Sequence, residues 1–221
     1  RVTNTPGVLA ETTADMAFAL LMAAARNVVA SDRDTRAGGW TTWSPTGFLG
    51  QDVFGATLGI VGLGEIGEAM ARRALGFRMR VVYTSRTRKP EAEARFGCRF
   101  VEIGELLAQS DFVSLHVPLN GSTRGMIGAR ELRLMKTSAI LVNTARGQVV
   151  DQGALIAALR DGVIGGAALE VTDPEPLPLE NPLYTFSNVI ITPHIASASL
   201  ATRAKMAEMA AANIIAVLAG Q

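Results

Sequence analysis

The sequence predicts an α/β fold, a doubly wound parallel sheet covered by helices on both faces. Short apolar runs typical of strands alternate with segments typical of helices over most of the chain. The predicted strands are apolar on both faces, as they are in parallel sheets buried between two helical layers. A glycine-rich turn at residues 62–67 joins the first of these strands to the helix that follows it.

The chain is expected to begin with an extended segment and a long apolar helix. Residues 1–8 are predicted to be extended and turn-like. The run 12–27 predicts a helix with Asp15 in its first turn and Arg26 in its last, an order that the helix dipole favours. Because this helix is apolar on nearly all sides, we expect it to be buried between elements or between subunits.

A long loop rich in glycine, tryptophan and proline is predicted between residues 38 and 55. It carries Trp40, Trp43 and Phe48, which is a large aromatic area for a loop. Loops with this much aromatic surface are typical of contacts with a partner.

Strands and helices then alternate to the end of the chain, with no internal repeat. The predicted strands are 57–62, 79–85, 111–117, 139–145, 165–171 and 188–192. The predicted helices are 65–75, 90–96, 128–135, 151–160 and 198–218. Such an alternation predicts parallel strands, with the helices filling the space on either side of the sheet.

Composition and charge restrict the possible partners. The 221 residues are 48% hydrophobic, and 21 basic against 20 acidic residues give a net charge of +1 without a basic stripe. Nucleic acid is therefore not an expected partner. The single cysteine, Cys98, forms no disulfide within the chain, and the longest apolar run, 16–25, is too short to cross a membrane. We expect a soluble cytoplasmic protein with no membrane partner and no metal site.

The turn at residues 62–67 fits the phosphate-binding pattern G-x-G-x-x-G between a strand and a helix. Glycines allow a tight turn and a close approach of the backbone to a pyrophosphate, and the helix N-terminus presents free N–H groups. An ordinary turn is the alternative, but the flanking strands and helix favour a dinucleotide site. Glu65 must then face solvent. The expected cofactor-binding residues here are Gly62, Gly64, Glu65, Ile66 and Gly67.

The end of the second strand indicates which dinucleotide is bound. Sites for NAD usually place Asp or Glu there to bind the ribose 2′-hydroxyl, whereas residues 83–89 contain no acid. Ser85, Arg86 and Arg88 are instead suited to a 2′-phosphate. A solvated basic loop is the alternative reading. We expect NADP(H) to be preferred and NAD to be possible.

Three polar residues follow later strands, at the edge of the sheet where ligands bind in open parallel sheets. They are Arg146, Glu175 and His194. Each alone has an ordinary structural explanation, as a loop cap, a turn residue or a packed histidine. Together, a cation, an acid and an imidazole at three such ends predict a catalytic site.

These residues lie within motifs that closely resemble those of the D-2-hydroxyacid dehydrogenases. The motifs are GLGEIG (62–67), SLHVPL (114–119), VNTARG (142–147), VTDPEP (171–176) and TPHIAS (192–197). Within the family, the sequence around the last two motifs is most similar to that of glyoxylate/hydroxypyruvate reductases. The resemblance covers nearly the whole chain and implies a Rossmann-type cofactor domain.

The resemblance implies a role for each matching residue. Arg146 would bind the substrate carboxylate and polarise the keto oxygen, and His194 would protonate that oxygen. Glu175 would orient His194 and favour its protonated form. Further cofactor-binding residues implied by the family are His116, Val117, Pro118, Thr123, Thr144, Ala145, Arg146, Glu170, His194 and Ala196.

Two positions depart from the family, and one residue has a second reading. Glu170 stands where Asp commonly accepts a bond from the nicotinamide carboxamide, and Ala196 stands where many members have Gly. His116 could equally be a histidine packed between strand and loop.

The family also implies how the chain is divided. Residues 1–221 form the NAD(P)-binding domain, with most of a smaller substrate domain absent. Within it, the expected parts are 1–11 as interdomain crossover, 12–55 as dimerisation helix and loop, 56–195 as dinucleotide-binding core and 196–221 as returning helix. A homodimer through the second part is expected.

Two other functions remain open at this stage. Another family member would act on 2-ketogluconate or 3-phosphohydroxypyruvate. A catalytically silent dinucleotide-binding module would bind the cofactor without turnover.

Overall fold

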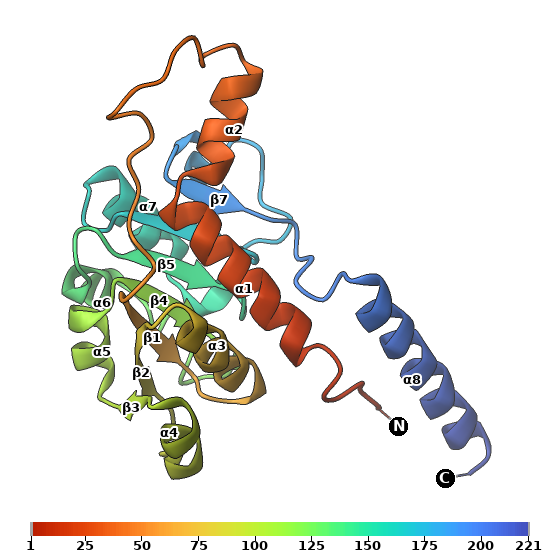
Figure 1. Ribbon diagram of the computed structural model, residues 1–221. Helices are drawn as coiled ribbons and strands as arrows, with labels where there is room; N and C mark the ends of the chain where they lie inside the picture. Colours follow the sequence, from red (N-terminus) through yellow and green to blue (C-terminus); the bar gives the residue numbers. More distant parts are fainter. Residues whose placement is uncertain (1, 221) are drawn as a thin grey trace.

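The computed structural model describes residues 2–220, and its centre is a sheet of seven parallel strands (Figure 1). The strands are β1 (Thr57–Val61), β2 (Arg80–Thr84), β3 (Arg99–Phe100), β4 (Phe112–Leu115), β5 (Ile140–Asn143), β6 (Gly166–Leu169) and β7 (Val189–Ile191). Their order across the sheet is β3-β2-β1-β4-β5-β6-β7. The predicted doubly wound parallel sheet is confirmed.

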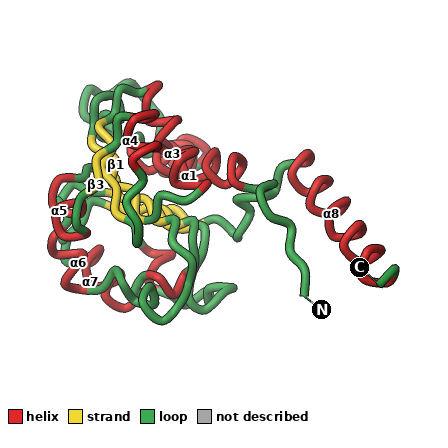
Figure 2. The backbone as a smooth tube through the Cα atoms, turned by 90° about the horizontal axis from the view of Figure 1, so that it is seen from below, coloured by secondary structure: helices red, strands yellow, loops and turns green. Residues whose placement is uncertain are grey.

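Helices cover both faces of this sheet. The helices of residues 2–220 are α1 (Ala10–Ala25), α2 (Val28–Arg36), α3 (Glu65–Gly76), α4 (Pro90–Phe96), α5 (Ile103–Gln109), α6 (Ala129–Leu134), α7 (Gln152–Arg160) and α8 (Leu200–Leu218), and six of them, α1 and α3 to α7, pack on the sheet. Helices α1, α3 and α4 pack with one face of the sheet in one apolar core, and α5, α6 and α7 form a second core with the other face. Figure 2 shows the sheet between these layers. Helices α2 and α5 and strand β3 were not predicted from the sequence.

The strand order reverses at β1, and this reversal creates a place for a ligand. From β1 the chain proceeds through α3 to β2 and β3 on one side, and it returns to β4 on the other side. The loops that leave the carboxyl ends of β1 and β4 therefore diverge and leave a crevice between them.

Helix α1 is a core helix of its own chain, and its observed boundaries correct the predicted ones. It runs from Ala10 to Ala25 rather than from 12 to 27, because Asn27 adopts a left-handed φ of 53° and begins α2 in a new direction. It contacts α3, β5 and β6, and residues such as Ala17 and Leu21 have no exposed surface. The predicted burial of this helix between elements is therefore confirmed.

Within residues 2–220, no single helix is long and apolar enough for a membrane span. By length and composition alone, α1 and α2 together would be sufficient for a membrane span, but the chain bends by 63° between them. The burial of α1 in the core accounts for its hydrophobicity.

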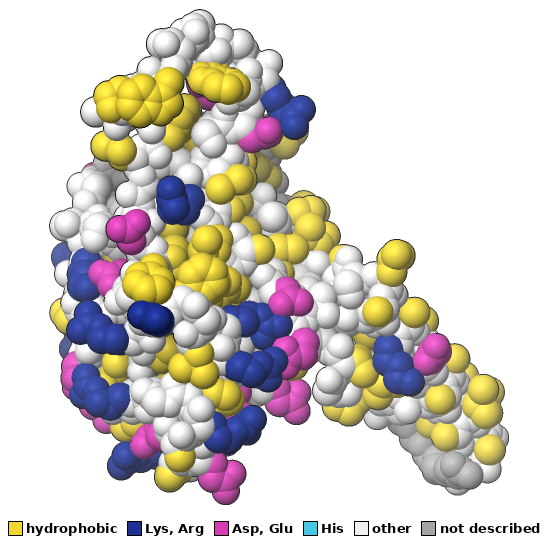
Figure 3. Space-filling view, viewed as in Figure 1, with side chains coloured by type: hydrophobic (Ala, Val, Ile, Leu, Met, Phe, Trp, Pro, Cys, Tyr) yellow, Lys and Arg dark blue, Asp and Glu magenta, His cyan; other side chains and the backbone are white. Residues whose placement is uncertain are grey.

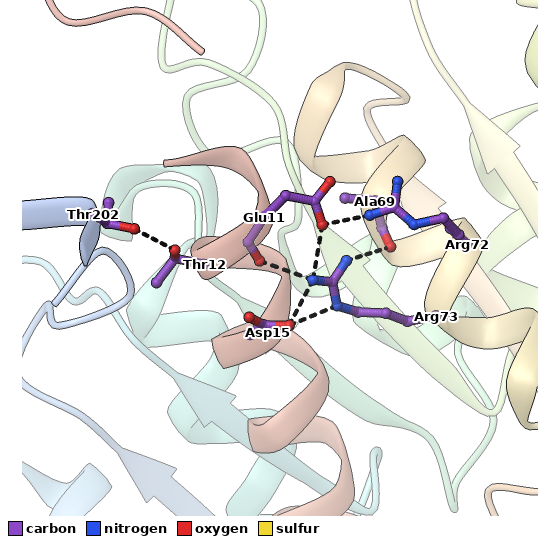
Figure 4. Close-up of polar contacts among 7 residues, drawn as sticks. All are labelled: Glu11, Thr12, Asp15, Ala69, Arg72, Arg73 and Thr202. Carbon is purple, nitrogen blue, oxygen red and sulfur yellow. Dashed lines mark hydrogen bonds and ion pairs between the residues drawn. The ribbon is translucent and has the colours of Figure 1, made fainter. Parts of the chain in front are cut away.

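Ion pairs join the start of α1 to α3, the helix that follows the glycine-rich turn (Figure 4). The Arg73 guanidinium donates to Asp15 Oδ1 at 2.6 Å and to Glu11 Oε2 at 3.0 Å, and Arg72 also binds Glu11. Hydrogen bonding by Arg72 lowers the pKa of Glu11. These contacts fix the position of α3, and with it the turn that precedes α3, against the core helix.

Two parts of the chain project from this body (Figure 1). One consists of α2 and the loop 38–55, and Figure 3 shows exposed hydrophobic side chains, in yellow, at its end. Trp40 is 72% exposed and Trp43 is 79% exposed, which confirms the predicted aromatic loop. The other projection is α8.

Helix α8 does not fill the space beside the sheet as predicted. Its only buried residue is Thr202, whose hydroxyl lies 2.6 Å from that of Thr12 at the start of α1. Further along, Asn213 donates a hydrogen bond to the carbonyl of Asn4. The helix therefore lies along the N-terminal segment and away from the core.

Candidate active site

A cleft of about 570 Å³ lies at the carboxyl edge of the sheet, where the loops after β4, β5 and β7 meet the start of α1. Nine of the predicted site residues line it: Ile66, His116, Val117, Pro118, Thr144, Ala145, Arg146, His194 and Ala196. Leu9, Thr13, Leu119 and Ser197 also line it and were not predicted. Thr13 lies one turn into an apolar helix, so its sequence pattern indicates packing rather than a site.

The glycine-rich turn has the shape that a pyrophosphate requires. Gly62 has a φ of +98°, and a Cβ there would lie 2.7 Å from the His116 carbonyl in the loop after β4. A Cβ on Gly67 would overlap the Gly62 carbonyl, so α3 packs directly on the turn. Gly64 begins α3 without a side-chain cap and faces open space within 4 Å. The α3 N-terminus is therefore accessible to an anion.

A second hollow of about 290 Å³ lies over this turn and shares Leu9, Ile66 and His116 with the cleft. Gly64 and Glu65 line it, and the Glu65 side chain is on the exposed surface as the sequence analysis required. The two hollows are thus adjacent, and together they extend from the α3 N-terminus to the loops after β5 and β7. This arrangement fits a dinucleotide whose pyrophosphate lies at the turn and whose nicotinamide lies in the cleft.

The loop after β5 presents Arg146 to the cleft. The buried Asn143 at the end of β5 holds this loop, because its side chain accepts from the Ala145 N–H and donates to the Arg146 carbonyl, both at 3.0 Å. Arg146 itself is exposed. Asn143 is a positioning residue that the sequence analysis missed, although it lies in the VNTARG motif.

His194 and Glu175 are brought together from two different loops. His194 Nδ1 lies 2.8 Å from Glu175 Oε1, and their side chains are 50% and 39% exposed. Because Glu175 engages Nδ1, the other ring nitrogen, Nε2, is left for a ligand in the cleft. His194 has a left-handed φ of 55°, so the backbone around it must be held firmly.

Glu170 holds the loop that carries His194. It is only 1% exposed, and its carboxylate accepts hydrogen bonds from the Ala196 N–H and the Thr192 hydroxyl. Its carbonyl also accepts from the His194 N–H at 3.2 Å. Within the described residues, the carboxylate is therefore committed to the loop after β7, on both sides of the strained histidine.

His116 lies at the floor of both hollows, in a polar setting. The hydroxyl of Ser114 lies 2.8 Å from its Nε2, and that of Thr144 lies 3.5 Å from its Nδ1. Burial lowers the pKa of His116 to about 4, so the ring is neutral at physiological pH. It can take part in hydrogen bonds with a bound group without adding positive charge.

The residues predicted to bind the ribose lie outside these two hollows, in the loop between β2 and α4. The Ser85 hydroxyl donates to the Thr87 carbonyl at 2.7 Å. Arg88 is paired with Glu93, whereas Arg86 forms no ion pair with any residue in the range 2–220. Of the two arginines predicted to bind a 2′-phosphate, Arg86 is thus the one without an ion pair among the described residues.

Thr123 also lies outside the two hollows, where it shapes the turn after β4. Its hydroxyl donates to the Pro118 carbonyl at 2.6 Å and accepts from the Asn120 N–H. The residue can therefore affect a bound cofactor through the position of Pro118.

Comparison with known proteins identifies the family. Residues 18–196 match the model of the NAD-binding domain of D-isomer specific 2-hydroxyacid dehydrogenases. The chain belongs to this family, and its fold is the NAD-binding domain of an NAD(P)-dependent dehydrogenase. The resemblance that the sequence motifs predicted is confirmed.

Three relatives show the degree of similarity. A glyoxylate reductase of Korarchaeum cryptofilum is 57% identical over 221 residues, and one of Thermococcus litoralis is 53% identical over 224 residues. The whole chain aligns to 67% of each relative. A crystal structure of a protein from Thermus thermophilus superposes with a TM-score of 0.95 at 52% identity, over 100% of this chain and 69% of that one. The chain thus spans about two thirds of the length of these relatives.

Proposed function

We propose that the protein reduces a small 2-keto acid, glyoxylate or hydroxypyruvate, to the D-2-hydroxy acid with NADPH. The observation that carries this proposal is that Arg146 and His194, the latter paired with Glu175, line one cleft next to the turn that fits a pyrophosphate. When bound, the reduced nicotinamide supplies the hydride. The names of the similar relatives support the choice of glyoxylate.

In this proposal, Arg146 binds the substrate carboxylate and polarises the keto oxygen with a permanent positive charge. His194 donates the proton from Nε2 to the keto oxygen as the carbon is reduced. Glu175 accepts the Nδ1–H bond, which keeps Nε2 directed away from the carboxylate and stabilises the protonated ring. Glu170 and Asn143 hold the two loops in place.

Substrate specificity can be tested with a panel of 2-keto acids on the full-length protein. Glyoxylate, hydroxypyruvate, 2-ketogluconate and 3-phosphohydroxypyruvate would each be assayed with NADPH and NADH. We expect the highest kcat/KM for glyoxylate or hydroxypyruvate. A higher value for one of the larger acids would contradict the proposal, and binding of the dinucleotide without turnover of any acid would show a silent module.

The preference for NADPH rests on the loop after β2. This loop has no acid at residues 85–89 to bind a ribose 2′-hydroxyl, and it exposes the uncommitted guanidinium of Arg86. A guanidinium binds a phosphate through two charge-assisted hydrogen bonds. Arg86 is therefore the residue that we assign to the 2′-phosphate.

We also propose that the protein is a homodimer joined through the projection formed by α2 and the loop 38–55. Three large aromatic side chains, Trp40, Trp43 and Phe48, are exposed there, 47% or more each. Surface patches of this kind are rare in monomers. Light scattering should return the mass of two chains, and Trp40→Ser with Trp43→Ser should lower it to the mass of one. A monomeric wild-type protein would contradict this.

A further inference from the structure

The loop that would meet the adenosine ribose contains a charge pair which the proposed function does not use. Arg88 Nε donates to Glu93 Oε1, and Arg88 Nη2 donates to Glu93 Oε2, both at 2.8 Å. This is a two-bond fork between a loop residue and a residue of α4. One donor edge of Arg88 is therefore directed at Glu93 rather than at the position of a ribose phosphate.

Glu93 is fixed in place by a buried residue. Tyr83 in β2 has no exposed surface, and its hydroxyl donates to Glu93 Oε1 at 2.8 Å. The same hydroxyl accepts from the Lys89 N–H at 2.7 Å, which ties the end of the loop to the strand. The Glu93 side chain is only 17% exposed, whereas that of Arg88 is 66% exposed. The acid is thus the anchored partner and the arginine is the exposed one.

Glu93 also carries a charge under all physiological conditions. Its hydrogen bonds from Arg88 and then Tyr83 lower the pKa of Glu93 to about 2. The carboxylate therefore offsets one positive charge of the loop, and it would repel a phosphate that approached Arg88. Arg86, two residues before Arg88, has no such acid among residues 2–220.

We propose that Glu93 limits the cofactor preference of this site by binding Arg88 and removing it from the cations that meet a ribose 2′-phosphate. The inference deepens the proposed function, since it concerns the NADPH preference of that same site. Arg86 then makes the main phosphate contact, and Arg88 contributes only when Glu93 releases it. The wild-type protein therefore prefers NADPH over NADH by less than it would if both Arg86 and Arg88 bound the 2′-phosphate.

The experiment uses two mononucleotides that differ only in the group of interest. Adenosine 2′,5′-bisphosphate and 5′-AMP would be titrated calorimetrically into the wild-type protein, Glu93→Gln, Arg88→Ala and the double variant. Glutamine keeps an acceptor for Tyr83, so Glu93→Gln should fold normally. Glu91→Gln is the matched control, because it removes an exposed acid of the same helix that forms no ion pair within the described residues.

We expect Glu93→Gln to bind the bisphosphate about fivefold more tightly, the worth of one exposed charge pair, with 5′-AMP unchanged. Arg88→Ala alone should change little, and the double variant should lose the gain. Weaker binding by Glu93→Gln, a gain that persists without Arg88, or an equal gain in Glu91→Gln would each overturn the inference. Failure of the NADPH proposal is separate: it would appear as equal binding of the two ligands by the wild-type protein.

Discussion

Glu175 and Glu93 each bind a basic side chain at 2.8 Å, His194 and Arg88 respectively. The two pairs differ in which atoms of the basic side chain they leave for a ligand. At the substrate end of the site, Glu175 binds one nitrogen of His194 and leaves the other free for the cleft. At the ribose end, Glu93 binds the guanidinium of Arg88 through two of its nitrogens.

The difference lies in what the basic group must do. A histidine that delivers a proton needs its charged form stabilised, and a carboxylate on its far nitrogen does this. An arginine that recognises a phosphate needs its charge uncompensated, and a carboxylate on its fork cancels that charge. Under the two proposals, the same kind of pair would support catalysis in one loop and reduce recognition of a phosphate in the other.

Removal of the proton donor should have the largest effect. In the full-length protein, His194→Ala should lower kcat by roughly 10²–10⁴, the usual contribution of a general acid. Cofactor binding, measured by fluorescence titration, should weaken far less than kcat falls, which separates catalysis from binding. If the variant kept most of its kcat, His194 would not be the proton donor, and the contrast between the two carboxylates would no longer hold at the substrate end.

Removal of the uncommitted arginine should have the next largest effect. Arg86→Ala should weaken NADPH binding by roughly 1–3 kcal/mol, the loss of a charge-assisted contact, and leave NADH nearly unchanged. Arg88→Ala serves as the control, because its charge is already paired, and it should have the smaller effect. If the two variants weakened NADPH equally, Glu93 would not be cancelling Arg88.

Neutralising the acid at the substrate end should slow the reaction less than removal of the proton donor does. In Glu175→Gln the side chain keeps its size, but the charged acceptor 2.8 Å from His194 Nδ1 is lost, and with it the contact that keeps Nε2 directed at the cleft. We expect kcat to fall, by less than in His194→Ala, while binding of the cofactor is unchanged. The measurement is steady-state kcat beside a fluorescence titration of the cofactor. An unchanged kcat would show that Glu175 only fills space beside the histidine.

The smallest effect concerns stability and the other histidine. Because the pKa of His116 is about 4 when folded and 6.5 ordinarily, the unfolded chain binds the proton first as pH falls. Stability from this residue is thus present above pH 6.5 and lost towards pH 4, by about 1–3 kcal/mol. His116→Gln should flatten this decline in denaturant titrations. Equal curves for His116→Gln and wild-type protein would contradict the neutral ring.

Local sequence determined much of the fold. The helix predicted at 90–96 has those boundaries in the structure, and each of the six predicted strands ends within two residues of its predicted bounds. These elements depend on nearest neighbours: apolar runs for buried strands, and proline or glycine at the ends. The two residues of β3 are too few to produce a periodic signal, and α5 lacks the proline that marks the start of α4 in the sequence.

The site was also predictable in its residue types. Strand ends in a parallel sheet share one edge, so the positions of Arg146 and His194 along the chain already implied that they meet. The turn at 62–67 was evident because only glycine permits its backbone conformation and its close contacts.

The tertiary structure alone decided which partner each polar side chain takes. The acid that pairs with Arg88 comes from the following helix, and its position depends on the buried hydroxyl of Tyr83. Glu170 looked like a cofactor contact in the sequence, but in the folded chain its carboxylate holds the loop around His194. Sequence patterns report burial and backbone preference, which are local, whereas a hydrogen-bond partner is chosen by proximity in three dimensions.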